Sequence, residues 1–202
     1  MTLPSRFPSI RPITRRERIR RDKNLKSRDN IFRDENSPNK FEFNDAVAEV
    51  FDDMLERSVP LYCECQNLTV EWCKRLAKPD TCIYDLGCST GSLLLSLAKS
   101  LPTISGLSLI GVDNSKAMLD KAQKKLGNFS SSVELVESNL NEPFSFDTSC
   151  TIVMNYTLQF IPKESRGSLL NNIYDSLVPG GGFILNEKVL SENELLSETF
   201  IE

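Results

Sequence analysis

Residues 84–91, with the sequence YDLGCSTG, have the types and spacing of a ligand-binding turn. They follow a short apolar run that favours a β-strand, and they precede a segment whose leucines recur at helical spacing. Gly87 and Gly91 allow the backbone to turn sharply and let a ligand approach where no Cβ intervenes. This strand, turn and helix together predict a binding site at the turn.

Asp113 is the second residue of the predicted site. It ends the apolar run 107–112 and lies 22 positions after Gly91, where nucleoside-binding α/β folds place the carboxylate that binds ribose hydroxyls. The dinucleotide-binding pattern is incomplete, because Ser89 stands in place of its middle glycine and its third glycine has no equivalent. The pattern predicts an adenosine-type ligand, and an ordinary strand-to-helix turn without a ligand is the alternative.

The other predicted elements alternate between strand and helix, which defines the fold class. We expect strands at residues 81–84, 107–112, 133–136, 150–154 and 183–185, helices at 45–57, 68–76, 92–101, 115–126 and 163–177, a break at 58–62, a tight turn at 179–182, and helix caps at Asn44 and Ser115. Alternation implies parallel strands with right-handed crossovers. The prediction is an open, mainly parallel, doubly wound α/β sheet, with its ligand beyond the carboxyl ends of the strands.

Charge divides the chain into a basic arm at residues 1–40 and an acidic domain at residues 41–202. The arm carries 12 Lys and Arg against 5 Asp and Glu, and the domain carries 12 against 23, which gives the net charge of −4. The arm has several prolines and few large apolar residues, so we expect it to be disordered when isolated. Contact with RNA through counterion release is one function for it. A solvated tail, a wrongly assigned start codon and an organellar transit peptide are the alternatives.

Composition argues against several classes of protein. The 6 cysteines show no disulfide-framework spacing, and Cys63 and Cys65 with Cys73 form no convincing metal site in a chain that has no histidine. We expect reduced thiols and no metal. No apolar run approaches the roughly 18 residues of a membrane span, and no hydrophobic leader opens the chain. These features predict a cytoplasmic protein.

Several segments resemble S-adenosylmethionine-dependent methyltransferases of class I, which have a Rossmann-like fold. More narrowly, the chain resembles carboxy-S-adenosyl-L-methionine synthases over residues 43–188. The strings that carry this narrower resemblance are EVFDDMLERSVPLY at 49–62, YDLGCS at 84–89, DNS at 113–115 and NYTLQF at 155–160, whereas LVPGG at 177–181 matches the broader methyltransferase fold.

The resemblance implies an enzyme that converts S-adenosylmethionine and prephenate to carboxy-S-adenosylmethionine. A partner enzyme would use this product to modify the wobble uridine of certain tRNAs. Positioning of the reactants and exclusion of water would supply most of the acceleration. Two other functions stay open: a methyltransferase acting on a small molecule or RNA, and a cofactor-binding module without turnover.

By position, the resemblance implies nine residues that bind S-adenosylmethionine. Asp113 would accept hydrogen bonds from the ribose, and the amides after Gly87 would approach the methionine part. Asn139 would bind the adenine amine where the family usually carries an acid. Tyr62 would face the sulfonium, with a packed core phenol as the alternative. The full set is Tyr62, Gly87, Cys88, Ser89, Asp113, Asn114, Asn139, Leu140 and Asn155.

No residue is assigned as catalytic. Asp85 is a candidate for a general base by location only, and we expect it instead to orient the glycine turn through hydrogen bonds. Members of the family continue beyond the equivalent of Glu202 with two further strands and an arginine for the transferred carboxylate. The resemblance implies that these parts are absent, and Arg166 on a predicted crossover helix is a poor substitute. The edge of the fifth strand is unprotected by charge or proline, so we expect homo-oligomers through it.

Overall fold

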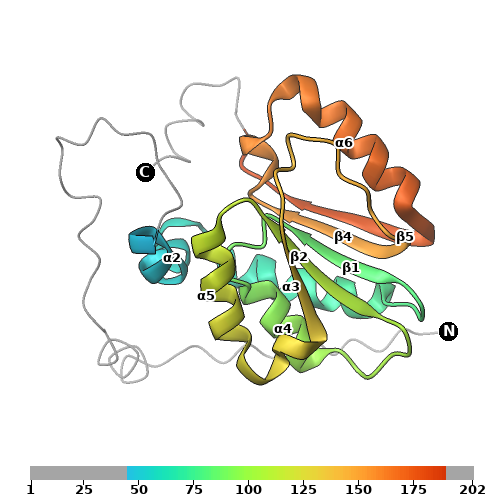
Figure 1. Ribbon diagram of the computed structural model, residues 1–202, viewed down its shortest axis with the longest axis horizontal. Helices are drawn as coiled ribbons and strands as arrows, with labels where there is room; N and C mark the ends of the chain where they lie inside the picture. Colours follow the sequence, from blue (N-terminus) through green and yellow to red (C-terminus); the bar gives the residue numbers. More distant parts are fainter. Residues whose placement is uncertain (1–44, 190–202) are drawn as a thin grey trace, which may run out of the picture. The chain divides into compact units, whose positions relative to one another are not determined.

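The computed structural model describes residues 45–189 (Figure 1). The predictions for the basic arm and for the cap at Asn44 concern residues outside this range. The described helices are α2 (Asp45–Ser58), α3 (Tyr62–Leu76), α4 (Ser92–Ser100), α5 (Lys116–Leu126) and α6 (Lys163–Ser176), with 3-10 helices η1 (Gly127–Ser132) and η2 (Leu158–Phe160). The strands are β1 (Cys82–Leu86), β2 (Ser108–Asp113), β3 (Val133–Glu137), β4 (Ser149–Asn155) and β5 (Leu177–Asn186).

The strands form one sheet in the order β3-β2-β1-β4-β5, and all neighbouring pairs are parallel. The predicted open, doubly wound α/β fold is therefore confirmed. Both faces of the sheet are covered, which is why β4 is buried along six consecutive residues and reads as a nearly continuous apolar run. The order reverses between β1 and β4, and ligands of such sheets bind at this reversal.

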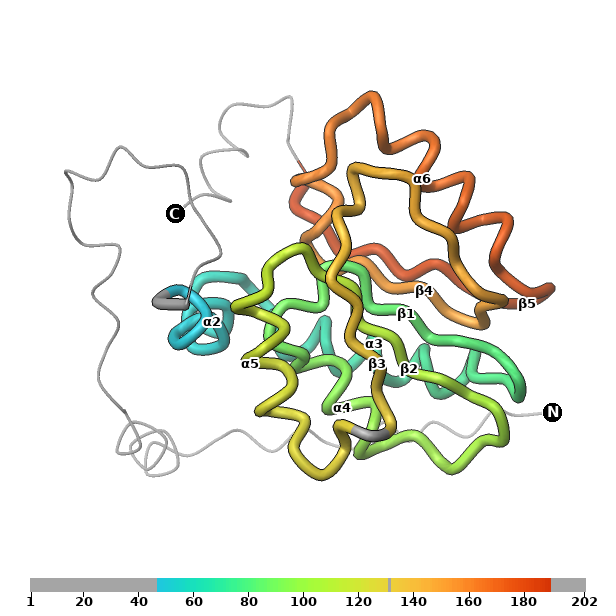
Figure 2. Tube along the Cα trace, viewed as in Figure 1, coloured from blue at the N-terminus to red at the C-terminus, as the bar shows by residue number. Residues whose placement is uncertain are grey.

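Side chains alternate between two core layers, as the period of a strand requires. Ile83 on β1 packs with residues of α3, α4 and α5, such as Leu94. Its neighbour Tyr84 points to the opposite face and packs with residues of α6, such as Ile173. Figure 2 shows the chain between β3 and β4 on the same side as α6, and Phe144 from this stretch packs edge-on against Tyr84.

Helix α3 begins earlier than the sequence predicted. The helix was expected from residue 68, but it starts at Tyr62, and the break after α2 shrinks to residues 59–61. Leu61 takes a left-handed conformation, with φ of 57°, which separates the two helices. The segment 62–67 was missed because its residues, YCECQN, show no apolar stripe.

The predicted tight turn at 179–182 is instead part of β5. Leu177 pairs with Ser149, and the next pair on β4 joins Thr151 to Gly182, so the intervening residues of β5 bulge out opposite Cys150. A Cβ on Gly181 would lie 2.8 Å from the Cys150 carbonyl oxygen, so the bulge needs a glycine there. The predicted cap at Ser115 is confirmed, because its side chain accepts a hydrogen bond from the Met118 N–H.

Candidate functional site

A cavity of about 430 Å³ lies at the carboxyl ends of the strands. Each of the five strands contributes residues to its wall from its own end or from the segment directly after it, and α2 contributes an apolar side. This is where open parallel sheets bind their ligands. The cavity brings together all nine predicted site residues: Tyr62, Gly87, Cys88, Ser89, Asp113, Asn114, Asn139, Leu140 and Asn155.

The turn between β1 and α4 requires small residues and unusual backbone angles. Gly87 has φ of +78°, and a Cβ added to it would lie 2.3 Å from Oγ1 of Thr157. Ser89 also takes a left-handed conformation, with φ of 51°, although such angles favour glycine. Ser89 thus holds a backbone conformation that glycine adopts more readily than any residue with a side chain.

The amides of this turn are already hydrogen-bonded within the protein. The N–H groups of Gly87 and Cys88 donate to the carbonyl oxygen of Val112, at 2.8 and 3.0 Å. The N–H of Ser89 donates to Oδ2 of Asp113 at 2.9 Å. These N–H groups are therefore used within the protein, because the end of β2 lies close enough to accept them. The approach of the amides after Gly87 to the methionine part of a cofactor stays a prediction.

Asp113 is held in a defined orientation at the end of β2. Its Oδ1 accepts the N–H of Ser115 and its Oδ2 accepts the N–H of Ser89, both at 2.9 Å. Burial raises the pKa of Asp113, and the backbone hydrogen bonds from Ser115, Ser89 and Asn114 oppose that rise. Each carboxylate oxygen has a second lone pair, so the group can still accept hydrogen bonds from two vicinal hydroxyls.

Two asparagines complete the polar wall. The Oδ1 atom of Asn139 accepts the N–H of Asn141 at 3.1 Å, so binding of an adenine amine would use the second lone pair of the same oxygen. The Oδ1 atom of Asn155 accepts a hydrogen bond from Nδ2 of Asn186 at 2.6 Å. Both side-chain amides are thus oriented by neighbours in the protein.

Asp85 is a buried carboxyl group on the cavity wall. Burial, followed by the nearby charge of Asp113, raises its pKa to about 7. Among residues 45–189, none donates a hydrogen bond to its side chain, so the prediction that it orients the glycine turn in this way is wrong. A carboxyl with such a pKa is half ionised near neutral pH, so a cation bound beside it would favour its ionised form.

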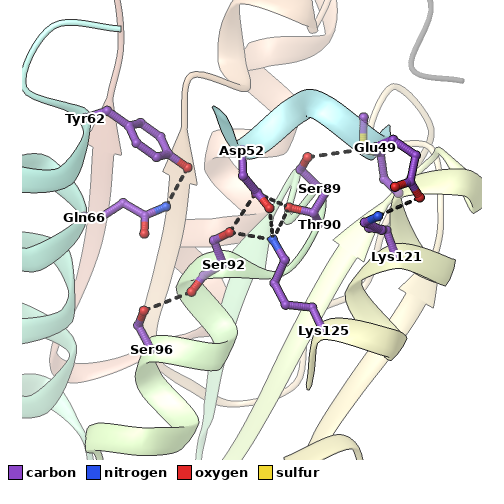
Figure 3. Close-up of polar contacts among 11 residues, drawn as sticks. Glu49, Asp52, Tyr62, Gln66, Ser89, Thr90, Ser92, Ser96, Lys121 and Lys125 are labelled. Carbon is purple, nitrogen blue, oxygen red and sulfur yellow. Dashed lines mark hydrogen bonds and ion pairs between the residues drawn. The ribbon is translucent and has the colours of Figure 1, made fainter. Parts of the chain in front are cut away.

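Tyr62 lies at the first residue of α3 and faces the cavity rather than the core. Its hydroxyl accepts a hydrogen bond from Nε2 of Gln66 at 2.7 Å (Figure 3). Its ring centroid lies 6.5 Å from that of Tyr156. Burial, and then the charges of Asp52 and Asp85, raise the pKa of Tyr62, so the phenol stays neutral. The ring provides an aromatic surface for a cation.

Helix α2 forms an apolar wall of the cavity through residues such as Phe51 and Met54. Polar contacts attach the helix to the rest of the domain: Glu49 pairs with Lys121, and a cluster forms around Asp52 (Figure 3). Asp52 accepts hydrogen bonds from the hydroxyls of Thr90 and Ser92, at 2.6 and 3.0 Å, and from Nζ of Lys125 at 2.5 Å. Burial alone would raise the pKa of Asp52, but these partners lower it.

No sequence pattern predicted this cluster, because Asp52 and Lys125 are 73 positions apart. Gln66, Thr157 and Lys188 also line the cavity without having been predicted. Thr157 lies within the string NYTLQF that carried the resemblance, so that string was the available signal. Arg166 lies outside the cavity wall, and its Nε donates to the carbonyl oxygen of Ile161.

Residues 45–189 contain no metal site, no disulfide and no membrane-spanning helix. No group of three or more His, Cys, Asp or Glu side chains within this range is arranged to hold a metal ion. The six cysteines are all free thiols. Every helix in the same range is too short or too polar to cross a membrane.

Comparison with known proteins places the fold. A family model of a methyltransferase domain matches residues 83–181. The chain resembles the crystal structure of a candidate S-adenosyl-L-methionine-dependent methyltransferase from Methanococcus maripaludis, with a TM-score of 0.58 and 22% identity, over 81% of this chain and 72% of that one. An S-adenosylmethionine-bound amino pentose methyltransferase from Micromonospora echinaspora gives a TM-score of 0.56 and 18% identity, over 77% and 61%. The chain has the class I S-adenosylmethionine-dependent methyltransferase fold.

A closer relationship appears at the level of sequence. The carboxy-S-adenosyl-L-methionine synthase of Methylococcus capsulatus is 42% identical to the chain over 179 residues, which is 87% of this chain and 74% of that protein. The chain belongs to the carboxy-S-adenosyl-L-methionine synthase family. This confirms the resemblance drawn from the sequence strings.

Proposed function

We propose that the chain is a carboxy-S-adenosyl-L-methionine synthase, which moves a carboxyl group from prephenate to the methyl carbon of S-adenosylmethionine. The product would serve the modification of wobble uridine in tRNA. Family membership supports the reaction, and one structural observation supports the binding site. The carboxylate of Asp113 and the turn at Gly87 are joined by the Ser89 hydrogen bond into one wall of a cavity, which suits a ribose and its attached methionine chain.

The residues present fit this cofactor. Asp113 would accept hydrogen bonds from the two ribose hydroxyls, and Asn139 would bind the adenine edge. Gly87 would let the turn lie directly against Thr157, since any Cβ there would meet that side chain, and the methionine chain would run along this part of the wall. When bound, S-adenosylmethionine supplies a methyl group made acidic by the adjacent sulfonium; this carbon would lose a proton and gain the carbon dioxide released by prephenate, and the hydroxide that prephenate loses as its ring becomes aromatic would take up the proton.

The protein's own groups would favour this chemistry in two ways. Asp85 and the rings of Tyr62 and Tyr156 surround the cavity with negative charge and aromatic faces, which stabilise a bound cation. The apolar side chains of α2, held by Asp52, would exclude water from the reacting carbon. Carbon dioxide released next to that carbon would then be captured before it escapes.

Two partner surfaces predicted from the sequence are part of this proposal: the outer edge of β5 for a second copy of the chain, and the basic arm at residues 1–40 for RNA. Strand β5 has β4 on one side, and within residues 45–189 no strand pairs with its other side. Leu185 on this strand is 42% exposed. Self-association through this edge is therefore proposed, and sedimentation velocity over a range of concentrations tests it. Contact of the basic arm with RNA is proposed from its charge alone.

The reaction is tested by incubating the purified chain with S-adenosylmethionine and prephenate and analysing the nucleosides by mass spectrometry. We expect a carboxylated cofactor only when both compounds are present. S-adenosylhomocysteine, which has no methyl group on sulfur, should yield none. Methyl transfer to RNA or a small molecule without dependence on prephenate would support a methyltransferase instead. Cofactor binding without any turnover would support a binding module and overturn the proposal.

A further inference from the structure

Lys188 is the one cationic side chain among the described residues that line the cavity. The acidic side chains that line the same cavity are Asp85 and Asp113. An anion that enters this cavity therefore meets two carboxyl groups, and Lys188 offers the compensating charge. Lys188 forms no ion pair with another residue in the described range, so its ammonium is available to a ligand.

The backbone that carries Lys188 is anchored to the cavity wall. The N–H of Tyr156 donates to the carbonyl oxygen of Asn186 at 2.7 Å. The N–H of Leu158 donates to Oε1 of Glu187 at 2.6 Å. The neighbouring Oε2 of Glu187 is buried without a hydrogen-bond partner in the described residues. These contacts tie the end of β5 to the segment after β4 and hold Lys188 at the cavity.

The order of the strands separates Lys188 from the predicted adenosine site. Asp113 ends β2 and Asn139 follows β3, whereas Lys188 follows β5, with β1 and β4 between β2 and β5. Three strand spacings of about 4.8 Å put roughly 14 Å between the ends of β2 and β5. A cofactor with its ribose at Asp113 and its methionine chain between the β1 turn and Asn155 at the end of β4 leaves the end of β5 for the second substrate.

We propose that Lys188 binds a carboxylate of the carboxyl donor, prephenate. This inference rests on the proposed function and adds a residue that recognises its second substrate. A lysine ammonium is a compact charge with three donors, which suits a carboxylate that must enter and leave. The side chain is exposed, so solvent screens the interaction and removal of the charge should weaken binding by roughly tenfold.

Equilibrium binding tests this without turnover. Prephenate is titrated by calorimetry into the full 202-residue chain saturated with S-adenosylhomocysteine, which cannot be carboxylated. We expect Lys188→Gln to weaken prephenate binding about tenfold and Lys188→Arg to keep it within about threefold, because arginine retains the charge. Lys99→Gln, on an exposed position of α4 outside the cavity, is the matched control and should change nothing. Affinity for S-adenosylhomocysteine should be the same in all variants.

Each other result has a distinct meaning. If the wild-type chain forms the carboxylated cofactor but Lys188→Gln binds prephenate as tightly as the wild type, the role of Lys188 is overturned and the proposed function stands. An equal loss of affinity for S-adenosylhomocysteine would assign Lys188 to the cofactor's own carboxylate and also overturn it. Weaker binding of carboxy-S-adenosylmethionine with unchanged prephenate binding would assign it to the product. A wild-type chain that binds no prephenate would overturn both this inference and the proposed function.

Discussion

The backbone N–H of Ser89 donates to Oδ2 of Asp113 at 2.9 Å, which joins the turn after β1 to the carboxylate after β2. Ser89 has φ of 51°, a conformation that costs a non-glycine residue roughly 1–2 kcal/mol. The hydrogen bond to a charged, largely buried acceptor offsets this cost. Two parts of the proposed cofactor site therefore depend on each other.

Removal of the Asp113 carboxylate should weaken cofactor binding strongly. Asp113→Ala removes the acceptor for the ribose hydroxyls and also releases the turn at Ser89. We expect affinity for S-adenosylmethionine to fall by roughly 30- to 1000-fold, which corresponds to about 2–4 kcal/mol. Isothermal titration calorimetry measures the change. A loss of less than threefold would rule out this role for Asp113.

The Asp52 cluster should control how firmly α2 covers the cavity. Asp52→Ala leaves Lys125 without its carboxylate partner and frees the hydroxyls of Thr90 and Ser92. Because the side chain of Asp52 is 43% exposed, we expect only about 1–2 kcal/mol of lost stability. Cofactor affinity should fall as well, since a loosened α2 admits water. Thermal unfolding and calorimetric titration would record both effects.

The neighbouring acid provides a matched control for that experiment. Asp53 lies on the same helix and pairs with Arg57, with 63% of its side chain exposed. Asp53→Ala should change stability by less than about 0.5 kcal/mol and leave cofactor affinity unaltered. Equal effects of the two substitutions would show that the Asp52 cluster has no special role at the cavity.

Gly87 should tolerate no side chain. Gly87→Ala combines a positive φ with a Cβ only 2.3 Å from Oγ1 of Thr157, and we expect a loss of about 2–5 kcal/mol in the free energy of unfolding. Gly167 in α6 is the control, since a Cβ there meets nothing within 4 Å. Gly167→Ala should stabilise the protein by about 0.5–1 kcal/mol. Similar urea midpoints for the two variants would contradict this account.

Local signals in the sequence were sufficient for much of the fold. The apolar runs located all five strands, and the serine before the Lys116 helix identified its cap, because both depend on neighbours in the chain. The glycine turn and Asp113 located the cavity for the same reason. All nine predicted site residues line one cavity. They could be named from the sequence because the family resemblance assigned them position by position.

What the sequence missed depends on contacts between distant residues. The turn amides donate their hydrogen bonds to Val112 and Asp113, which lie on another strand. The early start of α3 at Tyr62 could not be predicted from apolar periodicity, because the first turns of this helix face the cavity and solvent rather than the core. The cluster of Asp52 and Lys125 joins helices far apart in sequence, and no local pattern encodes such a pairing.

Asp85 should make both stability and cofactor binding depend on pH. Its pKa in the folded protein is about 7, against an ordinary value of 3.8. Between these values the folded state holds a proton that the unfolded state has released, so the free energy of unfolding should fall as pH rises from about 4 to about 7, by a few kcal/mol. Above this range the loss is complete and the curve should level off.

The variant Asp85→Asn should flatten that dependence, because the amide stays neutral throughout. Urea unfolding at about pH 5 and about pH 8 measures the difference, with Asp53→Asn as a control that should follow the wild type. Ionised Asp85 also attracts a cation, so affinity for S-adenosylmethionine, whose net charge is positive, should increase as pH rises through about 7 in the wild type. In Asp85→Asn the affinity should be lower at high pH and nearly independent of pH. A wild-type affinity that stays constant across this range would show that Asp85 does not face the bound cofactor.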